Sequence, residues 1–494
     1  MVETRNLMRP GKAVLIINIL AMFLLISAFG VSTARADEQE SGAASGQIPA
    51  GYGGVELSAQ LGNVSSDLLQ GEAGIPQMLT MESAVEWALE HNREIARLTL
   101  EIDAAQAAVR GSHLLYMPSL DIGGRSMSMG PAGTVEIPIP GNPIEIRTST
   151  TDITNTISMT LSQPVYTFGS FSLAGRGASL GLDQARLNLA RARQTVRNDT
   201  EEAFLRAALA QAMVGVREQA VATAEERLRI AQVRFDAGEA ARFEVLRAQV
   251  GVATSRQDLL QAQTSSDLAM SALVQKMGLP TGTTIDIEPP VAEEVDAVAP
   301  GLTLDEAWQT ALDNRMDLKA LELAVELSEV GALSQRNRPM LAFQGNYSRS
   351  DRASMFANKE SWSVVLSFTY RFYDFGRSRA SMEEGWAKRD ALRAQVEDIR
   401  TLVGLEVESA YKSLITSLER IEVARATLES AREAVRIAEL GYSEGVITYI
   451  DFQDADLGYR QAETLHLQAV YEYLTAVSGL RAAMGVDDFP MQAQ

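Results

Sequence analysis

Three carboxylates near the C-terminal end follow a glycine-containing break in a long proline-free segment. Asp451, Asp454 and Asp456 come directly after the stretch GYSEGVITYI, which begins at Gly441. On a helix, Asp451 and Asp454 share one face because they lie three residues apart, whereas Asp456 is turned away. Paired carboxylates can attract cations, but the same spacing also occurs on an ordinary solvated helix face.

Other residues with chemical potential are few and scattered. The absence of cysteine excludes disulfides, thiolate metal sites and catalytic thiols. His91, His113 and His466 lack ligand spacing, so they are interpreted as surface or packed residues. No Ser-His-Asp framework, Gly-rich phosphate loop or zinc motif is recognisable. We therefore predict no catalytic residue, no metal site and no cofactor, and a protein that is not an enzyme. A net charge of −20 argues against nucleic acid as a partner.

The N-terminal 36 residues have the pattern of an export signal. A basic start precedes the apolar run AVLIINILAMFLLISAFGV, and Ala34-Arg35-Ala36 offers a small-x-small cleavage site. An uncleaved membrane anchor is the alternative, because 19 apolar residues are long for a signal core. Residues 37–78 are rich in Gly and Ser and are predicted to form a flexible N-terminal extension.

The remaining chain contains the same pattern twice. Leu79 begins LTMESAVEWALEHNREI and Leu302 begins LTLDEAWQTALDNRMDL, 223 residues later (302 minus 79). QPVYTFG at Gln163 is matched by YRFYDFG at Tyr370, at an offset of 207 (370 minus 163). The length of the repeat predicts a duplicated domain rather than a short-period solenoid. We assign residues 79–280 to the first repeat, 281–301 to a Pro- and acid-rich connector, and 302–489 to the second repeat.

Each repeat is predicted to contain an opening helix and a long helical hairpin. The runs between Pro164 and Pro280 and between Pro339 and Pro490 lack proline and are rich in helix-forming residues. Apolar residues recur there at coiled-coil spacing. We predict long helices over 170–234 and 377–440, each on the order of 90–100 Å long. The hairpin turns are placed at Gly238 and Gly445.

Between the helices, each repeat is predicted to contain a strand pair, at 118–166 and at 339–372. One face of the last strand carries Trp362, Val364, Leu366, Phe368 and Tyr370, and small polar residues alternate with them. This period-two pattern fits a wall between lipid and water, with a possible aromatic belt, and it also fits a half-buried soluble sheet. If the strands span a membrane, their edges must be paired, because unpaired backbone groups in hydrocarbon are costly. Four strands are too few for a barrel, which must then be shared between copies of the chain.

In this order and duplicated, these motifs resemble the TolC family of outer-membrane efflux and export channels. The resemblance covers about 79–487 and rests on the segment from Leu79 to Leu120, the two strand ends, the terminal MGL and MGV, and the turns RFDAGEAARFEVLRAQ and GYSEGVITYIDFQDAD. It implies a membrane β-barrel plus an all-α tunnel: a homotrimer with four strands per chain in a shared twelve-stranded barrel. Long coiled-coil-like helices would form a periplasmic α-barrel. The implied partners are outer-membrane lipid, a periplasmic adaptor (membrane fusion) protein and an inner-membrane transporter.

The resemblance also assigns a gate at the hairpin ends. Asp451 and Asp454 match the family's acidic rings, whose mutual repulsion is expected to raise the pKa of some members. Tyr442 matches an aromatic residue of the gate contacts, and Glu244 holds the equivalent place in the first repeat. Ile447 stands where the family has an arginine, so the nature of the latch is open.

The implied function is a passive exit duct of a tripartite efflux pump or a type I secretion system. The alternative is a non-channel envelope scaffold or adhesin that uses the helices as spacer rods. The sequence does not choose a cargo among drugs, metals, polysaccharide and secreted protein.

Overall fold

The computed structural model describes residues 78–128, 134–137, 144–147, 153–238, 240–280, 282–290, 295, 297–351, 359–444 and 446–486. The predicted signal peptide, nearly all of the predicted extension over 37–78, and Gly445 lie outside the described residues. The chain divides into two compact units. In the described residues, one contains the strands, over Leu114–Ser170 and Asn337–Phe372, and the other contains the helices. Each unit draws on both predicted repeats, and the repeat boundaries themselves stay a prediction.

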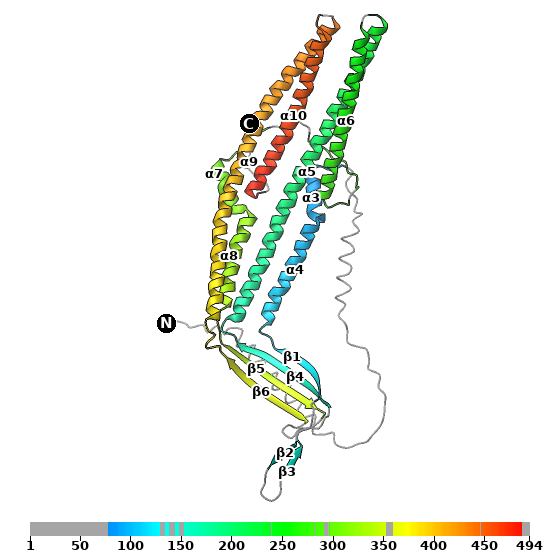
Figure 1. Ribbon diagram of the computed structural model, residues 1–494. Coiled ribbons are helices and arrows are strands. Elements are labelled where there is room, and N and C mark those ends of the chain that lie inside the picture. Colours follow the sequence, from blue (N-terminus) through cyan, green and yellow to red (C-terminus); the bar gives the residue numbers. More distant parts are fainter. Residues whose placement is uncertain are drawn as a thin grey trace, which may run out of the picture. The chain divides into compact units, whose positions relative to one another are not determined.

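The strand unit contains one four-stranded antiparallel sheet (Figure 1). Its members are β1 (Ser119–Ser128), β4 (Ile153–Tyr166), β5 (Met340–Ser350) and β6 (Glu360–Thr369), in the order β1-β4-β5-β6. All four lie in the two predicted strand pairs. The β4–β5 pairing joins the two repeats, and β1 and β6 are the edges. A second pair, β2 (Thr134–Ile137) with β3 (Ile144–Arg147), was not predicted and lies in the connection between β1 and β4.

The register gives this sheet one apolar and one hydroxyl-rich face. Side chains alternate along each strand, so residues directly opposite one another share a face. On one face, a row runs Ile122, Met159, Tyr347, Trp362 across the four strands. On the other face, Thr156 lies 2.9 Å from Ser350 and Ser348 lies 2.8 Å from Ser361 between hydroxyl oxygens. Apolar side chains therefore gather on one side of the sheet, and small hydrogen-bonding groups gather on the other.

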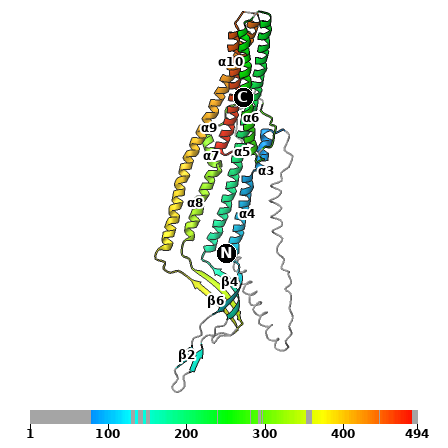
Figure 2. The same cartoon turned by 45° about the vertical axis from the view of Figure 1, so that its right-hand side comes forward.

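The helical unit is built on two long helices, α5 (Ser170–Asp236) and α9 (Arg377–Ser443), of 67 residues each. Each is paired in a hairpin with a shorter helix, α6 (Arg242–Lys276) or α10 (Tyr449–Met484), as Figure 1 and Figure 2 show. At about 1.5 Å per residue, each long helix measures roughly 100 Å. The predictions of 170–234 and 377–440 are confirmed to within a few residues. Among the described residues, no helix has the length and apolar character needed to cross a membrane.

The single opening helix predicted for each repeat is wrong, because each is split in two. The first becomes α3 (Met81–His91) and α4 (Arg93–Leu114), and the second becomes α7 (Leu304–Asn314) and α8 (Met316–Ser334). The breaks are extended residues at equivalent positions, Asn92 with ψ 126° and Arg315 with ψ 120°. New bonds compensate for the break: Asn92 Oδ1 accepts from Glu94 N at 2.8 Å, and the Arg315 guanidinium donates to Asp317.

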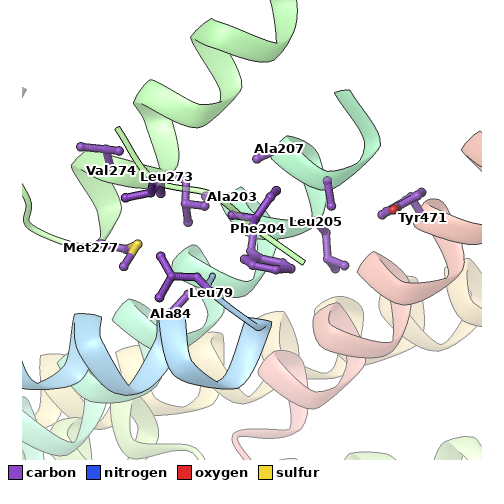
Figure 3. Close-up of a cluster of buried hydrophobic side chains, with 13 residues drawn as sticks. Leu79, Ala84, Ala203, Phe204, Leu205, Ala207, Leu273, Val274, Met277 and Tyr471 are labelled. Carbon is purple, nitrogen blue, oxygen red and sulfur yellow. The ribbon is translucent and has the colours of Figure 1, made fainter. Parts of the chain in front are cut away.

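Two hydrophobic clusters hold the shorter helices against the long ones. In the first repeat, Phe204 on α5 packs with Leu273, Met277 and Leu79, all fully buried (Figure 3). In the second, Val407 and Leu414 on α9 pack with Leu480 and Met484 on α10. Leu273 and Met277 are matched by Leu480 and Met484 at the offset of 207 residues. Tyr471, from α10, joins the first cluster and so ties the two repeats together (Figure 3).

The duplicated Phe-Gly pair marks the turn before each long helix. Phe168 and Phe375 both adopt positive φ, 48° and 55°, and a glycine with positive φ follows each. A left-handed conformation is uncommon for a bulky residue. In each turn the phenylalanine ring packs edge-on against the tyrosine two residues before it, with centroids 4.6 and 4.7 Å apart. The motif that revealed the repeat is therefore a specific turn conformation.

Candidate functional site

The hairpin between α9 and α10 is closed by its own backbone. Val446 N donates to Gly441 O at 2.8 Å and Ile447 N donates to the same oxygen at 3.2 Å. A Cβ on Gly441 would lie 3.2 Å from Ile447 Cγ1, so the Ile447 side chain covers this glycine. Ile447 therefore packs within its own hairpin. In the first hairpin, Gly238 has φ +80° in the turn after α5, as the turn prediction requires.

Asp451 has a local role that sequence reasoning missed. It forms a capping box with Thr448 at the start of α10: Asp451 N donates to Thr448 Oγ1 at 3.3 Å, and Asp451 Oδ2 accepts from Thr448 N at 3.1 Å and from its hydroxyl at 2.6 Å. These hydrogen bonds, the side-chain one foremost, hold the pKa of Asp451 below its ordinary value. The T-x-x-D spacing was the available signal.

The other predicted gate residues are placed as follows. Asp454 is exposed, one helical turn beyond Asp451. Glu244 is half-buried in the first turn of α6, the equivalent place in the first hairpin. Tyr442, in the last turn of α9, makes cross-hairpin contacts. Within one chain, Asp451 and Asp454 lie on exposed surface of the second hairpin.

Tyr442 connects the two hairpins through Arg234 of α5. Arg234 Nη1 donates to the Tyr442 hydroxyl at 2.5 Å, and the guanidinium carbon lies 5.5 Å from the centre of the same ring. The Tyr442 ring stacks on Phe452 of α10, with centroids 5.6 Å apart and planes 6° from parallel. Arg234 of the first repeat thus contacts Tyr442 of the second through a hydrogen bond and a cation–π interaction.

Arg227, two turns earlier on α5, makes the second connection. Its guanidinium carbon lies 4.9 Å from the centre of the Phe452 ring, and its Nη2 lies 2.6 Å from Asp456 Oδ1. The N–H directions are poorly aimed at the carboxylate, and Nε has no hydrogen-bond acceptor in the described part of the chain. The contact is therefore best described as a close ion pair. Arg460 completes it from the other side, with Nε 2.8 Å from Asp456 Oδ2.

Asp456 is the buried member of this group. The residue is 8% exposed, in contrast to the exposed Asp451 and Asp454. Burial by itself raises the pKa of Asp456, but the hydrogen bond from Arg460 and the close positive charge of Arg227 outweigh it, so the pKa lies below its ordinary value. Asp456, which the helical spacing places away from the face of Asp451 and Asp454, therefore links α10 to α5. We call Arg227, Arg234, Tyr442, Phe452, Asp456 and Arg460 the hairpin latch.

The histidines occupy unrelated positions. His91 stacks on Trp87 with ring centroids 4.0 Å apart, His113 is exposed, and His466 is buried. In the described ranges, no group of three or more His, Cys, Asp or Glu side chains could hold a metal ion.

The predicted lipid-facing residues lie on the apolar face of the sheet. Trp362, Val364, Leu366 and Phe368 alternate along β6, and Trp362 is 78% exposed. Tyr370 lies just beyond the end of β6 and is also exposed. Aromatic residues mark both ends of this face: Tyr347 with Trp362 at one end, and Tyr166 with Phe368 at the other. An exposed apolar band with aromatic ends has the pattern of a membrane-facing wall.

A sheet with one apolar face, joined to helical hairpins with rods of roughly 100 Å, defines an outer-membrane channel subunit. The sequence model of the outer membrane efflux protein family matches residues 84–279 and 307–486. The chain belongs to this family. Its fold is that of the TolC-like channels, and it is a protein of the outer membrane with a long periplasmic extension.

Individual relatives agree with this assignment. Nodulation protein T of Rhizobium leguminosarum bv. trifolii is 21% identical over 420 residues, which cover 83% of this chain and 85% of that protein. The alkaline protease secretion protein AprF of Pseudomonas aeruginosa is 23% identical, with coverage of 67% and 69%. The crystal structure of the open state of the MtrE outer membrane channel of Neisseria gonorrhoeae matches with a TM-score of 0.67 at 16% identity, covering 82% of this chain and 89% of that one. Such relatives support a channel for efflux or secretion.

We predict that Asp456→Asn loosens the second hairpin. It leaves Arg227 and Arg460 half-buried without their carboxylate, a loss on the order of 3 kcal/mol of local stability. Hydrogen-exchange mass spectrometry should show faster exchange at the start of α10 and in the last turns of α5. Asp454→Asn is the control, because Asp454 is exposed, and it should leave exchange unchanged.

We predict that the contact of Asp456 with Arg227 and Arg460 makes the stability of the second hairpin depend on pH only in acid. Because the folded-state pKa of Asp456 is lowered, its stabilisation is present above the unfolded value of about 3.9 and is lost as the pH falls through the folded value. Protection at the start of α10 should therefore persist from about pH 7 to pH 5 and decline only below about pH 4. A decline near pH 6 that Asp456→Asn abolishes would contradict this assignment.

Proposed function

We propose that three copies of the chain form a trimeric outer-membrane channel-tunnel, the passive exit duct of a tripartite efflux pump or type I secretion system. The observation that carries the proposal is the four-stranded sheet with an apolar face and two open edges, β1 and β6. In hydrocarbon, the backbone groups of these edges need partners. Pairing β6 of one copy with β1 of the next satisfies both edges, and three copies give a twelve-stranded closed barrel of ordinary size.

The helices supply the rest of the duct. Long helices of 67 residues exceed what a globular core requires, and each is covered by shorter helices stacked along it. Arranged around the same threefold axis, they continue the barrel as a periplasmic tunnel. A periplasmic adaptor and an inner-membrane transporter would complete the assembly, and the chain itself carries out no chemistry. One relative is named for nodulation and another for protease secretion, so relatedness selects no single cargo.

The hairpin latch is the proposed gate fastener. Arg227 and Arg234 of α5 contact the aromatic pair and Asp456 of the second hairpin, and these contacts would hold the gate where Ile447 replaces the family's arginine. Separating the hairpins would take Arg227 away from the largely buried Asp456 carboxylate, which would keep only Arg460 of its own helix, and this cost favours the closed arrangement. Opening then requires a partner that compensates for the lost contacts.

Asp454 and Asp451 are the proposed acidic rings at the tunnel end. Threefold symmetry would place three copies of each around the axis, where carboxylates attract cations and repel anions. The capping box lowers the pKa of Asp451 within each chain, which opposes the rise that mutual repulsion would cause. Asp454 is exposed and lies one turn further along α10, so it would contribute more to ion selectivity than Asp451 does.

We predict that the purified protein is a trimer whose neighbouring chains pair through β1 and β6. The cysteine-free chain permits Ile122→Cys with Val364→Cys, two positions on the apolar face. In one chain these sites are three strand spacings (~14 Å) apart across the sheet and two residues (~7 Å) apart along it, or roughly 16 Å in all, so a shorter bismaleimide should link only different chains and give covalent trimers. Each single variant should stay unlinked. Monomers without conductance in planar bilayers would refute the duct.

We predict that Arg227→Gln with Arg234→Gln opens the tunnel. The double variant removes both cationic contacts to the second hairpin, so single-channel conductance in planar bilayers should rise. Arg229→Gln is the matched control. Arg229 lies on the same helix, its side chain is 65% exposed, and among the described residues it forms an ion pair only with Glu226 of its own helix. Equal conductance of the double variant and of Arg229→Gln would show that the hairpin latch does not keep the tunnel closed.

We predict that Asp454→Asn weakens cation preference and block by divalent cations without loosening the hairpin. Asp451→Asn should produce a smaller change in reversal potential together with faster hydrogen exchange in the first turn of α10, since it also weakens the capping box by replacing the charged acceptor with a neutral amide oxygen. Unchanged ion selectivity in both variants would show that Asp451 and Asp454 do not line the narrowest part of the tunnel.

A further inference from the structure

We propose that the apolar face of the sheet carries a binding site for the phosphate group of an outer-leaflet lipid. A cavity of about 520 Å³ opens where the strands run towards the β1–β4 and β5–β6 connections. Alternation places six of its lining residues on the apolar face: Gly124, Ser126, Asn155, Ile157, Arg349 and Asp351. This is a polar recess on a face that is otherwise apolar.

The register places the recess at a defined level. Gly124, Ile157, Arg349 and Glu360 form one row across β1, β4, β5 and β6. The neighbouring row on the same face, two residues nearer the helix-joined end, includes Tyr347 and Trp362. Aromatic residues of this kind lie at the boundary between hydrocarbon and headgroups. The recess is thus one step beyond that boundary, where lipid phosphates are found.

Arg349 is the phosphate-binding group of the recess. Its side chain is 70% exposed, and Glu360 on β6 engages one side of the guanidinium at 3.2 Å. A guanidinium offers five N–H donors in a planar fork, so donors remain for a phosphate after one ion pair is made. Bidentate arginine–phosphate contacts are among the stronger hydrogen bonds in proteins.

The walls of the recess are fixed by hydrogen bonds. The Asn155 backbone N–H donates to Asp351 Oδ1 at 3.1 Å, and the Asn155 side-chain amide donates to Asp351 Oδ2 at 2.9 Å. These bonds engage both oxygens of Asp351 and fix its carboxylate in the wall of the recess. The space over Gly124 is open, since a Cβ added there would meet nothing within 4 Å. A lipid headgroup seated over Gly124 can leave its acyl chains along Ile122 and Met159 on the same face.

The position on the membrane wall selects the ligand. Free phosphate would be recognised by the same guanidinium, but the recess borders the exposed apolar band, so a phosphate attached to acyl chains gains contacts that a free anion lacks. We therefore assign the site to a phosphorylated lipid of the outer leaflet. The assignment rests on the sheet lying in the outer membrane and not on the gate or on the cargo.

Native mass spectrometry of the intact protein in detergent, titrated with lipid A, tests the site. Arg349→Gln should weaken binding about tenfold, as expected for loss of a charge-assisted hydrogen bond. Gly124→Leu should also abolish tight binding by filling the recess, without a clash in the fold. Glu360→Gln should tighten binding, because it frees the guanidinium from a competing carboxylate.

The matched control is Arg371→Gln, the same change in charge at an exposed arginine beyond the helix-joined end of β6. It should bind lipid A as the unaltered protein does. Equal binding by the Arg349→Gln and Arg371→Gln variants, equal binding of dephosphorylated lipid A, or full competition by inorganic phosphate would each overturn the assignment. Arg349→Gln should keep normal conductance in planar bilayers, so failure of the lipid site and failure of the duct are distinguishable.

Discussion

The structure depends above all on the requirement that backbone hydrogen bonds be satisfied inside a bilayer. A four-stranded sheet with one apolar face leaves two rows of N–H and C=O groups open at β1 and β6. In water this would be tolerable, but in hydrocarbon each unpaired group costs several kcal/mol. Pairing with other copies of the chain, as proposed above, would satisfy both edges. In the proposed trimer, the shared barrel, the threefold symmetry and the tunnel along the same axis would all follow from that requirement.

The helical unit meets a different constraint, that of holding long thin rods in place. Nearly all of its fully buried side chains lie where the shorter helices cover the long ones, around Phe204 in the first repeat and Leu414 in the second. Towards the hairpin ends this apolar cover gives way to cation–π and ionic contacts. Such contacts need specific partners at specific positions on the two hairpins. In the proposed channel, a tunnel end that is either closed or open would benefit from such contacts.

The duplication has diverged at the latch. At the offset of 207 residues, Arg227 corresponds to Ala434 and Arg234 to Gly441. Asp456 corresponds to Gln249, and Phe452 to Val245. The first repeat thus supplies the two arginines that reach across to the other hairpin, and the second supplies the aromatic rings, the acid and Arg460. Two identical hairpins would present like groups to each other, so this asymmetry is what allows them to bind within one chain.

The sequence by itself determined the elements and their repetition. Helices of 67 residues, the strand alternation and the Phe-Gly turns follow from local composition and periodicity, which act within a few residues. The capping box at Thr448 and Asp451 was present in the sequence as a T-x-x-D spacing, although it was not used. Only the tertiary structure decided the breaks at Asn92 and Arg315, the cross-strand register and the latch. Arg227 and Asp456 are 229 residues apart (456 minus 227), and whether they meet depends on the rotation and depth of two packed helices. No local pattern specifies that rotation, because it is set by the whole set of contacts along the rods.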